Sequence, residues 1–290
     1  MAARLRTAGL FLLLLALFGL IGWLLGGFFA NEWYLGAAIF LGLAAVMNLI
    51  AYFGGARLVL RSYRAKVVEE KEAPKLYRAV RHVAQMGDLP MPKVALISSP
   101  TPNAFATGRN PKNAVVAVTE GLLNLLPEEE LEGVLAHEMA HIKDRDILVM
   151  TVSATLAGAI AFMARVALWG GLFRQRNQGA LLLLLVIGIT APLAAILVQL
   201  AISRTREYRA DEVGGRTLRK PLHLARALEK LETANRRRPM QRGNPASASL
   251  FIVNPFRRRS ALVRLFSTHP PLEERIRRLR ELAREFGQYY

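Results

Sequence analysis

The sequence predicts an α+β membrane protein, in which a mainly helical water-soluble domain with a small β-sheet is combined with four transmembrane helices in two hairpins. The composition is the first reason. Of the 290 residues, 52% are hydrophobic and 21% are charged, which is too apolar for an ordinary soluble domain and too charged for a pure membrane bundle. The second reason is that the apolar residues gather in four long runs, separated by segments with mixed helix and strand patterns.

Two apolar runs near the N-terminus predict the first hairpin, within residues 1–53. Ala8–Ala30 carries no charge and is long enough to cross the roughly 30 Å hydrocarbon core of a bilayer. Tyr34–Phe53 follows after three residues, which predicts a tight hairpin. A cleaved signal peptide is the alternative for the first run. We favour a retained helix, because a signal peptide has a shorter apolar core and ends in a small-x-small cleavage site.

A second pair of apolar runs predicts a hairpin over residues 147–202. The third run is Ile147–Ala164, followed by Arg165, and the fourth is Ala180–Ile202. An arginine inside a span is often functional. Arg165, however, lies almost a full bilayer thickness beyond Ile147, so that its side chain can reach the far headgroups, and we favour this interpretation.

The distribution of Lys and Arg predicts a multi-pass protein of the cell (inner or plasma) membrane with its water-soluble domain in the cytoplasm. Basic residues flank both outer ends of the first hairpin, and its loop contains none, so the positive-inside rule places both ends in the cytoplasm. Two arginines between the third and fourth runs, Arg174 and Arg176, argue weakly against this orientation. They leave a shallow or re-entrant second hairpin as an alternative.

Residues 54–146 and 203–290 are predicted to form one water-soluble domain, because the second hairpin returns the chain to the side it left. In the first part we expect a helix, a strand, a turn-rich loop, a second strand and a second helix, at Glu69–Met86, Val94–Ile97, 99–113, Ala114–Thr119 and from Pro127 onward. In the second part we expect three helices, at Ser203–Leu218, Pro221–Ala234 and 269–286.

The absence of cysteine and the formal net charge of +17 limit the possible functions. Disulfides, thiolate metal sites and cysteine nucleophiles are excluded, so a metal site must use histidines and carboxylates. The charge is compatible with nucleic-acid binding, but the basic runs at 235–238 and 256–259 lack a recognition motif and interleaved aromatic residues. Cytoplasmic loops and contact with anionic headgroups explain the charge, so we expect a lipid bilayer and no nucleic acid as partner.

The stretch His137–His141, "HEMAH", predicts a metal site on a helix. The four-residue spacing places both imidazoles on one helix face, and Glu138 lies beside them, where it can accept a proton from water on the metal. With imidazole ligands and no cysteine, zinc is the expected ion. A chance pair of histidines is the alternative, but the chain has only five histidines and two of them have this spacing around a glutamate.

A catalytic zinc ion needs a third protein ligand and an open position. The candidates are the remaining histidines, His82, His223 and His269, or a carboxylate. Glu207 and Asp211 lie four residues apart on the predicted helix that follows the fourth apolar run, and the hairpin would bring this helix beside the "HEMAH" helix. Glu207 is then the third ligand, and Asp211 can accept a hydrogen bond from a ligating histidine. Without the hairpin, two solvated acids among arginines would be the better interpretation.

Five motifs occur along the chain: "NAFATG", "HEMAHIKDRD", "SRTREYRAD", "NPASASLFIVNP" and "HPPLEERI". Together they resemble the HtpX family of membrane zinc metalloproteases, relatives of the type I CAAX prenyl proteases, over nearly the whole chain. The resemblance implies a zincin-type metalloprotease domain of the gluzincin group. It implies one Zn²⁺ per chain on His137, His141 and Glu207, with Glu138 as the base. Asp144 and Arg145 depart from the Asn-containing version of the second motif, which leaves the ligands unchanged.

The resemblance also implies two contacts with substrate. Asn103 would lie on an edge strand that pairs with the substrate, and His269 would contact the scissile carbonyl as an oxyanion donor. An N-cap before the two prolines is an equally good interpretation of His269. His82 and His223 match no motif of the family, and we expect them at the surface.

We therefore expect a zinc-dependent membrane endopeptidase whose substrates are proteins or peptides, mainly membrane proteins, on the cytoplasmic side. That these substrates are misfolded or damaged, as in a stress response, is implied by the resemblance alone. Cleavage within the membrane core is an alternative, but polar residues flank "HEMAH" on both sides. A catalytically silent zinc-binding scaffold or chaperone is another, and the retention of Glu138 argues against it.

Overall fold

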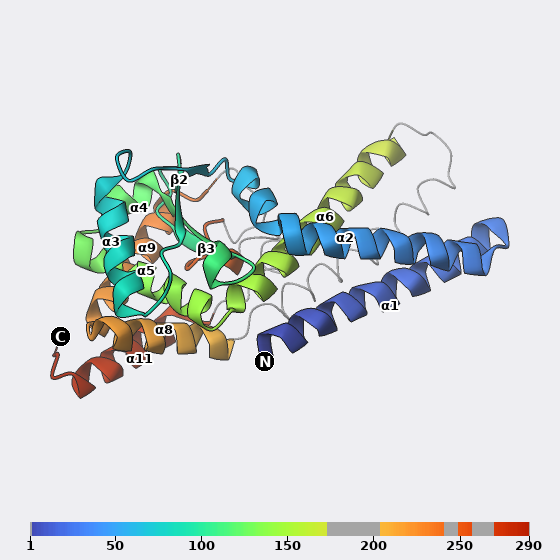
Figure 1. Cartoon of the computed structure of the whole chain (residues 1–290). Helices are drawn as coiled ribbons and strands as arrows, with labels where there is room; N and C mark the ends of the chain where they lie inside the picture. The colour runs from blue at the N-terminus through green and yellow to red at the C-terminus, as the bar shows by residue number, and fades with distance from the viewer. Residues whose placement is uncertain (1, 173–203, 241–248, 257–269, 290) are drawn as a thin grey trace.

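The computed structural model of the chain describes residues 2–172, 204–240, 249–256 and 270–289 (Figure 1). Helix α1 (Ala2–Ala30) and helix α2 (Trp33–Ser62) form an antiparallel hairpin that projects from a mixed body of helices and strands. Helix α6 (Asp146–Leu172) leaves the body on the same side. The predicted fourth run and the side chain of Arg165 lie outside the described residues.

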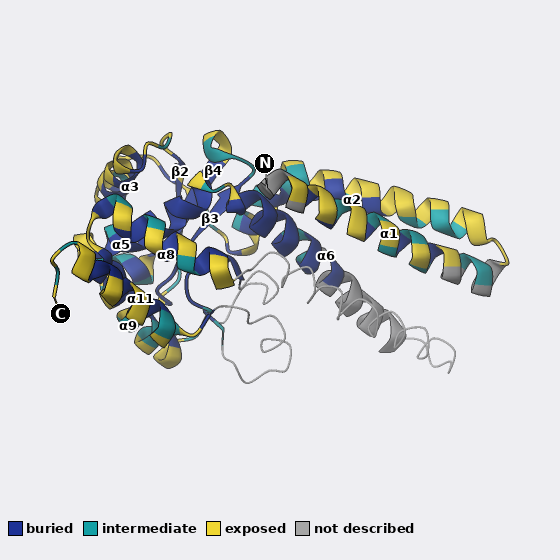
Figure 2. Ribbon diagram, turned by 90° about the horizontal axis from the view of Figure 1, so that it is seen from below, coloured by how far each residue is buried: buried dark blue, intermediate teal, exposed yellow. Residues whose placement is uncertain are grey.

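The α1–α2 hairpin confirms the first two predicted apolar helices, and α2 ends nine residues later than expected. The helices approach closely at Gly36, where a Cβ atom would lie 2.2 Å from the carbonyl oxygen of Gly22. Figure 2 shows exposed residues along the outer faces of the hairpin. Among the described helices, Trp33–Ser62 is the one long and apolar enough to cross a membrane, and Thr7–Trp23 and Asp146–Gly158 are shorter apolar stretches. The set of four transmembrane helices therefore remains a prediction.

A four-stranded sheet has the order β1-β2-β4-β3, with strands at Lys66–Val67, Lys93–Ile97, Ala114–Thr119 and Ala104–Gly108 respectively. β2 and β4 are parallel and confirm the two predicted strands, whereas β3 pairs antiparallel with β4, with Ala104 opposite Val118. The loop that the residue pattern predicted over "NAFATG" was wrong, because residues 104–108 form the edge strand β3. The family resemblance implied an edge strand at Asn103, and β3 begins at the next residue. All five residues of β3 are buried, so they lack the apolar–polar alternation that identifies a half-exposed strand.

Among the described residues, six further α-helices form the rest of the body with the sheet: α3 (Pro74–Met86), α4 (Glu120–Leu125), α5 (Glu128–Lys143), α8 (Arg204–Leu218), α9 (Pro221–Arg237) and α11 (Leu272–Glu285). α3 begins five residues later than predicted, because Pro74 occupies the first turn, where its missing N–H costs nothing. The short α4 was not predicted. Its N-cap is Thr119, whose side chain accepts a hydrogen bond from the Leu122 N–H.

Helix α5 is the central element of the body. It lies between the sheet on one side and α8 and α9 on the other (Figure 1). Every residue from Gly133 to Ile142 is buried, and Val134 and Leu135 join a hydrophobic cluster with Val116 of β4 and Leu228 of α9. Polar side chains on this stretch are therefore held in a rigid, dry environment, and this stretch contains "HEMAH".

Candidate metal centre

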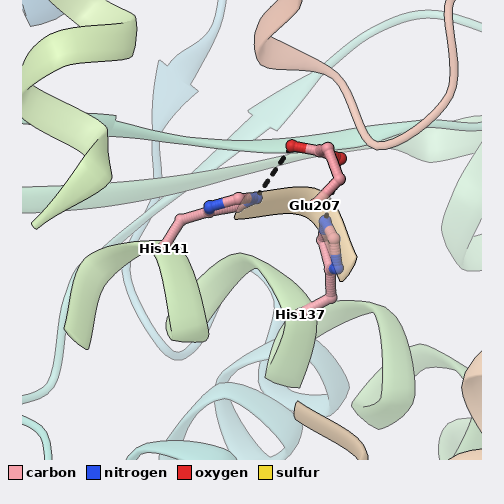
Figure 3. A group of neighbouring side chains, drawn as sticks. All are labelled: His137, His141 and Glu207. Atoms are coloured by element: carbon pink, nitrogen blue, oxygen red, sulfur yellow. Dashed lines mark ion pairs between the residues drawn. The ribbon is translucent and has the colours of Figure 1, made fainter. Parts of the chain in front are cut away.

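His137 and His141 of α5 and Glu207 of α8 bring their side chains to one point (Figure 3). One ligand atom from each lies within 4.8 Å of the others. His141 Nε2 is 3.4 Å from Glu207 Oε1, and His137 Nε2 is 3.8 Å from Glu207 Oε2. All three residues are at most 3% exposed. The structure thus brings together the three residues that the sequence predicted as a ligand set, from two separate helices.

The donor set fits zinc. Two imidazole nitrogens and one carboxylate oxygen are a common set for catalytic zinc, which leaves a fourth position open. Ligands about 2.1 Å from one tetrahedral ion lie about 3.4 Å from each other. The nitrogen–oxygen distances of 3.4 and 3.8 Å run to different oxygens of Glu207, and with one ligand atom per residue the three atoms lie within 4.8 Å of one another, somewhat wider than that geometry.

The second nitrogen of His137 faces a buried carboxylate and guanidinium. His137 Nδ1 lies 2.9 Å from Asp211 Oδ1, which turns Nε2 toward Glu207. Arg275 of α11 donates to both oxygens of Asp211, at 2.7 and 2.8 Å. Burial would raise the pKa of Asp211, but the Arg275 guanidinium outweighs it and holds the pKa below its ordinary value. Asp211 thus lies where the sequence placed it, beside a candidate ligand.

Sequence reasoning missed Arg275, which is 1% exposed and has the largest fully buried side chain of the described residues. The last helix contains several arginines, and the sequence alone did not distinguish Arg275 from the others. A signal was present, because Arg275 lies at helical spacing from Leu272, Leu279 and Leu282, on the apolar face of α11. A charged residue on an apolar helix face needs a buried partner.

Asp146 and Arg206 occupy the corresponding position beside His141, and sequence reasoning missed both. His141 Nδ1 is 3.7 Å from Asp146 Oδ2, and Arg206 lies 3.3 Å from the other Asp146 oxygen. Burial would lower the pKa of His141, but the Asp146 and Glu207 carboxylates raise it to about 10. The carboxylates that face His141 thus favour its protonated form when no metal ion is bound.

Glu138 is held against the edge strand of the sheet. It is 1% exposed, and its Oε2 accepts a hydrogen bond of 2.8 Å from the main-chain N–H of Ala106 in β3. Burial raises the pKa of Glu138 to about 8. A nearby cation favours the ionised carboxylate, so a metal ion on the adjacent histidines would lower this pKa and make Glu138 a base at neutral pH.

The remaining sequence candidates lie elsewhere. Asn103 is fully buried directly before β3, and its side-chain Nδ2 donates to the carbonyl of Val253 at 2.6 Å. His82 is exposed and lies 2.6 Å from Glu132, and the half-buried His223 lies on α9. Neither belongs to the metal cluster found among the described residues. His269 lies outside the described residues. Substrate contacts of Asn103 and His269 therefore stay predictions.

The close approach of α8 to α5 depends on Gly214, and this makes a testable prediction. A Cβ atom at Gly214 would lie 2.9 Å from the His137 amide nitrogen and 3.0 Å from the Ala136 carbonyl carbon, so α8 would have to move. We expect Gly214→Ala to lower the free energy of unfolding by about 1–3 kcal/mol. It should also weaken zinc retention, because Glu207 moves with α8.

Gly215→Ala is the matched control, because the nearest atoms are side-chain and ring carbons of Leu282 and Pro221, which can shift at lower cost. Thermal unfolding and zinc content are measured for both purified variants, and we expect larger losses for Gly214→Ala than for Gly215→Ala. Equal unfolding temperatures and equal zinc content for the two variants would contradict this account of how α8 is positioned.

Comparison with known proteins places these features in context. Residues 70–283 match Peptidase family M48. The protease HtpX homolog of Thermococcus sibiricus is 50% identical over 98% of this chain and 97% of its own length, and that of Syntrophobacter fumaroxidans is 51% identical over 97% and 100%. The crystal structure of S. mikatae Ste24p, at 20% identity and a TM-score of 0.47, is matched over 94% of this chain, which spans 62% of that protein. The matched family region contains all three residues of the cluster.

Proposed function

The chain belongs to peptidase family M48 and is a metalloprotease, and we propose that it is a zinc-dependent endopeptidase of the cell membrane that cleaves membrane-associated proteins on the cytoplasmic side. The observation that carries the zinc site is the convergence of His137, His141 and Glu207 within 4.8 Å, with Glu138 beside them. Misfolded or damaged membrane proteins are the proposed substrates, because extended segments are the form in which a peptide backbone can enter such a site.

A bound zinc ion would supply a Lewis acid that polarises the scissile carbonyl and lowers the pKa of the attacking water. The residues of the chain do the rest. Glu138, ionised beside the cation, accepts a proton from the water as it attacks the carbonyl carbon, and then passes that proton to the departing amine. His269 is proposed as a donor to the carbonyl oxygen, where negative charge develops. Asp211 and Arg275 keep His137 turned toward the centre, and Asn103 is proposed to contribute to substrate binding.

The proposed location follows from the apolar helices and the charges that flank them. α2 is long and apolar enough to cross a bilayer, it carries Arg57 and Arg61 near its C-terminal end, and Arg64 follows it. α6 begins only three residues after α5 ends. The metal centre would then lie close to the membrane surface on the positively charged side, where loops of membrane proteins emerge.

Removal of the metal tests this function. The full-length protein, purified in detergent, should cleave a membrane protein and an unfolded soluble protein, with new N-termini detected by mass spectrometry. A zinc chelator should reduce cleavage at least a hundredfold, and added Zn²⁺ should restore it, because the centre supplies the electrophile. His141→Asn should abolish both zinc binding and cleavage.

His223→Asn is the control for the loss of a histidine, since His223 is outside the cluster. It should retain one zinc ion per chain and full activity. Cleavage that survives both chelation and His141→Asn would refute the zinc mechanism. Zinc binding without any cleavage would leave the scaffold alternative.

A further inference from the structure

The outer edge of β3 is already occupied in this structure. In an antiparallel pair, alternate residues direct their main-chain groups away from the partner strand. Thr119 donates to the Asn103 carbonyl, so Ala104, Ala106 and Gly108 point away from β4. The N–H of Ala106 is bonded to Glu138, and that of Gly108 is bonded to Thr151. Most of the outward-facing main-chain groups of β3 are therefore already hydrogen-bonded and are not free to pair with an added polypeptide.

The segment Leu250–Val253, here called the strap, occupies the start of this edge. The N–H of Ile252 donates to the Ala104 carbonyl at 3.2 Å, and the Val253 carbonyl accepts from Asn103 Nδ2 at 2.6 Å. The first is a main-chain bond of the kind that an added peptide strand makes with a sheet edge, and the second is made by the side chain of Asn103. The outward-facing N–H and carbonyl of Ala104 and the N–H of Ala106 all have hydrogen-bond partners. Among the described residues, we find no partner for the Ala106 carbonyl.

The strap is packed firmly and is connected to the metal centre. Phe251 packs against Phe105 of β3 and Tyr63, with ring centroids 5.0 and 4.9 Å apart. Leu250, Phe251 and Ile252 are each 1% exposed. Arg275, which holds Asp211 beside His137, also donates to the Ile252 carbonyl at 2.9 Å. One guanidinium therefore contacts both the strap and the carboxylate that orients a candidate ligand.

We propose that the strap is an internal occupant of the substrate edge, and that a polypeptide substrate gains access to the metal centre by replacing it. The inference rests on the proposed peptidase function. The candidate ligands and Glu138 are at most 3% exposed, so a polypeptide cannot reach them in this arrangement. A substrate strand would re-form the bonds to Ala104 and Asn103 that the strap gives up, so the exchange replaces these two hydrogen bonds with similar ones. With the strap in place, the metal centre is thus closed to other polypeptides and to other segments of the same chain.

A reversible disulfide that ties the strap to β3 tests the proposal. The chain contains no cysteine, so two introduced cysteines have no other thiol in the chain to pair with. A main-chain hydrogen bond of 3.2 Å joins Ala104 and Ile252, so we choose the pair Ala104→Cys with Ile252→Cys for a disulfide, whose formation is verified before the rates are compared. We expect the oxidised double variant to cleave an unfolded protein at least tenfold more slowly than the same variant after reduction with a phosphine.

The single variant Ile252→Cys is the matched control and should show no such redox dependence. Equal rates for the oxidised and reduced double variant, with the disulfide verified by mass spectrometry, would overturn the proposal. A wild-type protein without peptidase activity would instead refute the proposed function.

A second measurement covers the case in which the reduced double variant is inactive. In a Glu138→Gln background, adding an unfolded polypeptide should accelerate hydrogen exchange at the Ile252 amide at least fivefold if the strap is displaced. Unchanged or slower exchange at this amide would show that the strap stays in place when substrate binds, and would overturn the proposal equally.

Discussion

Glu138→Gln is expected to lower kcat by about 100- to 10,000-fold, the usual contribution of a general base, while one zinc ion per chain is retained. Glutamine has the size of glutamate, and its side-chain oxygen can still accept the N–H of Ala106, so the local packing is preserved. It cannot accept a proton at the pH of the reaction. The loss should therefore appear in kcat, with little change in KM for an extended peptide.

In the zinc-free protein, the same substitution should not lower the unfolding temperature. Burial raises the pKa of Glu138 to about 8, so an ionised Glu138 is a cost to the folded state at neutral pH. A neutral glutamine removes that cost. The combination of a large loss in kcat with equal or higher stability distinguishes a catalytic role from a structural one.

Glu132→Gln is the matched control on the same helix, because Glu132 pairs with His82 away from the metal cluster. It should leave kcat and zinc content within about twofold of the wild-type values, as expected for an exposed pair. Metal analysis, peptide cleavage and thermal unfolding of both variants are sufficient. Activity of Glu138→Gln within tenfold of wild type would assign the base to another residue.

The parts of the site that could be predicted from the sequence are those with a fixed local spacing. The helical period alone was sufficient to predict that His137 and His141 share a site. The prediction of Glu207 and Asp211 required the same period together with the assumption of a hairpin. The prediction failed at β3, because its five buried residues have no alternation that would identify a strand. Asp146 and Arg206 were missed because a single ion pair 60 residues apart leaves no periodic signal.

The strap was missed for a related reason. "NPASASLFIVNP" was noted as a motif, yet its contacts with Asn103 and Ala104 join residues about 150 positions apart. Such contacts depend on how α8, α9 and α11 return the chain to the sheet. Short-range patterns determine which side chains share a helix face, whereas the placement of whole elements depends on packing of the entire core.

Arg275→Met is expected to reduce the free energy of unfolding by about 3–5 kcal/mol, the usual loss when one partner of a buried ion pair is removed. Methionine fills much of the volume, but it leaves Asp211, which is 2% exposed, without the two hydrogen bonds that Arg275 donates. Zinc should bind more weakly as well, because residues that orient a ligating histidine typically contribute about 10- to 100-fold to metal affinity.

Two further variants distinguish the effect of the Arg275 charge from the effect of its packing. Adding Asp211→Asn to Arg275→Met should restore part of the stability, because no unpaired charge remains buried, while zinc affinity stays low. Arg278→Met lies on the same helix and removes a surface pair with Glu274, so it should cost about 1 kcal/mol or less. If the double variant is less stable than Arg275→Met, the guanidinium acts through packing, and the charge argument is wrong.

The pH dependence gives an independent check on the same pair. In the wild type the folded-state pKa of Asp211 is below its ordinary value of 3.8, so its ionisation stabilises the fold above that pH and the contribution is lost as the pH falls through the folded pKa. In Arg275→Met, burial without the guanidinium raises the pKa above 3.8, and the ionised carboxylate becomes a cost. The stability gap between the two proteins should therefore be largest near pH 7 and should narrow as the pH approaches 4. A gap that is constant over this range in urea unfolding would mean that Asp211 does not change its ionisation with Arg275, and that the orienting role belongs to another group.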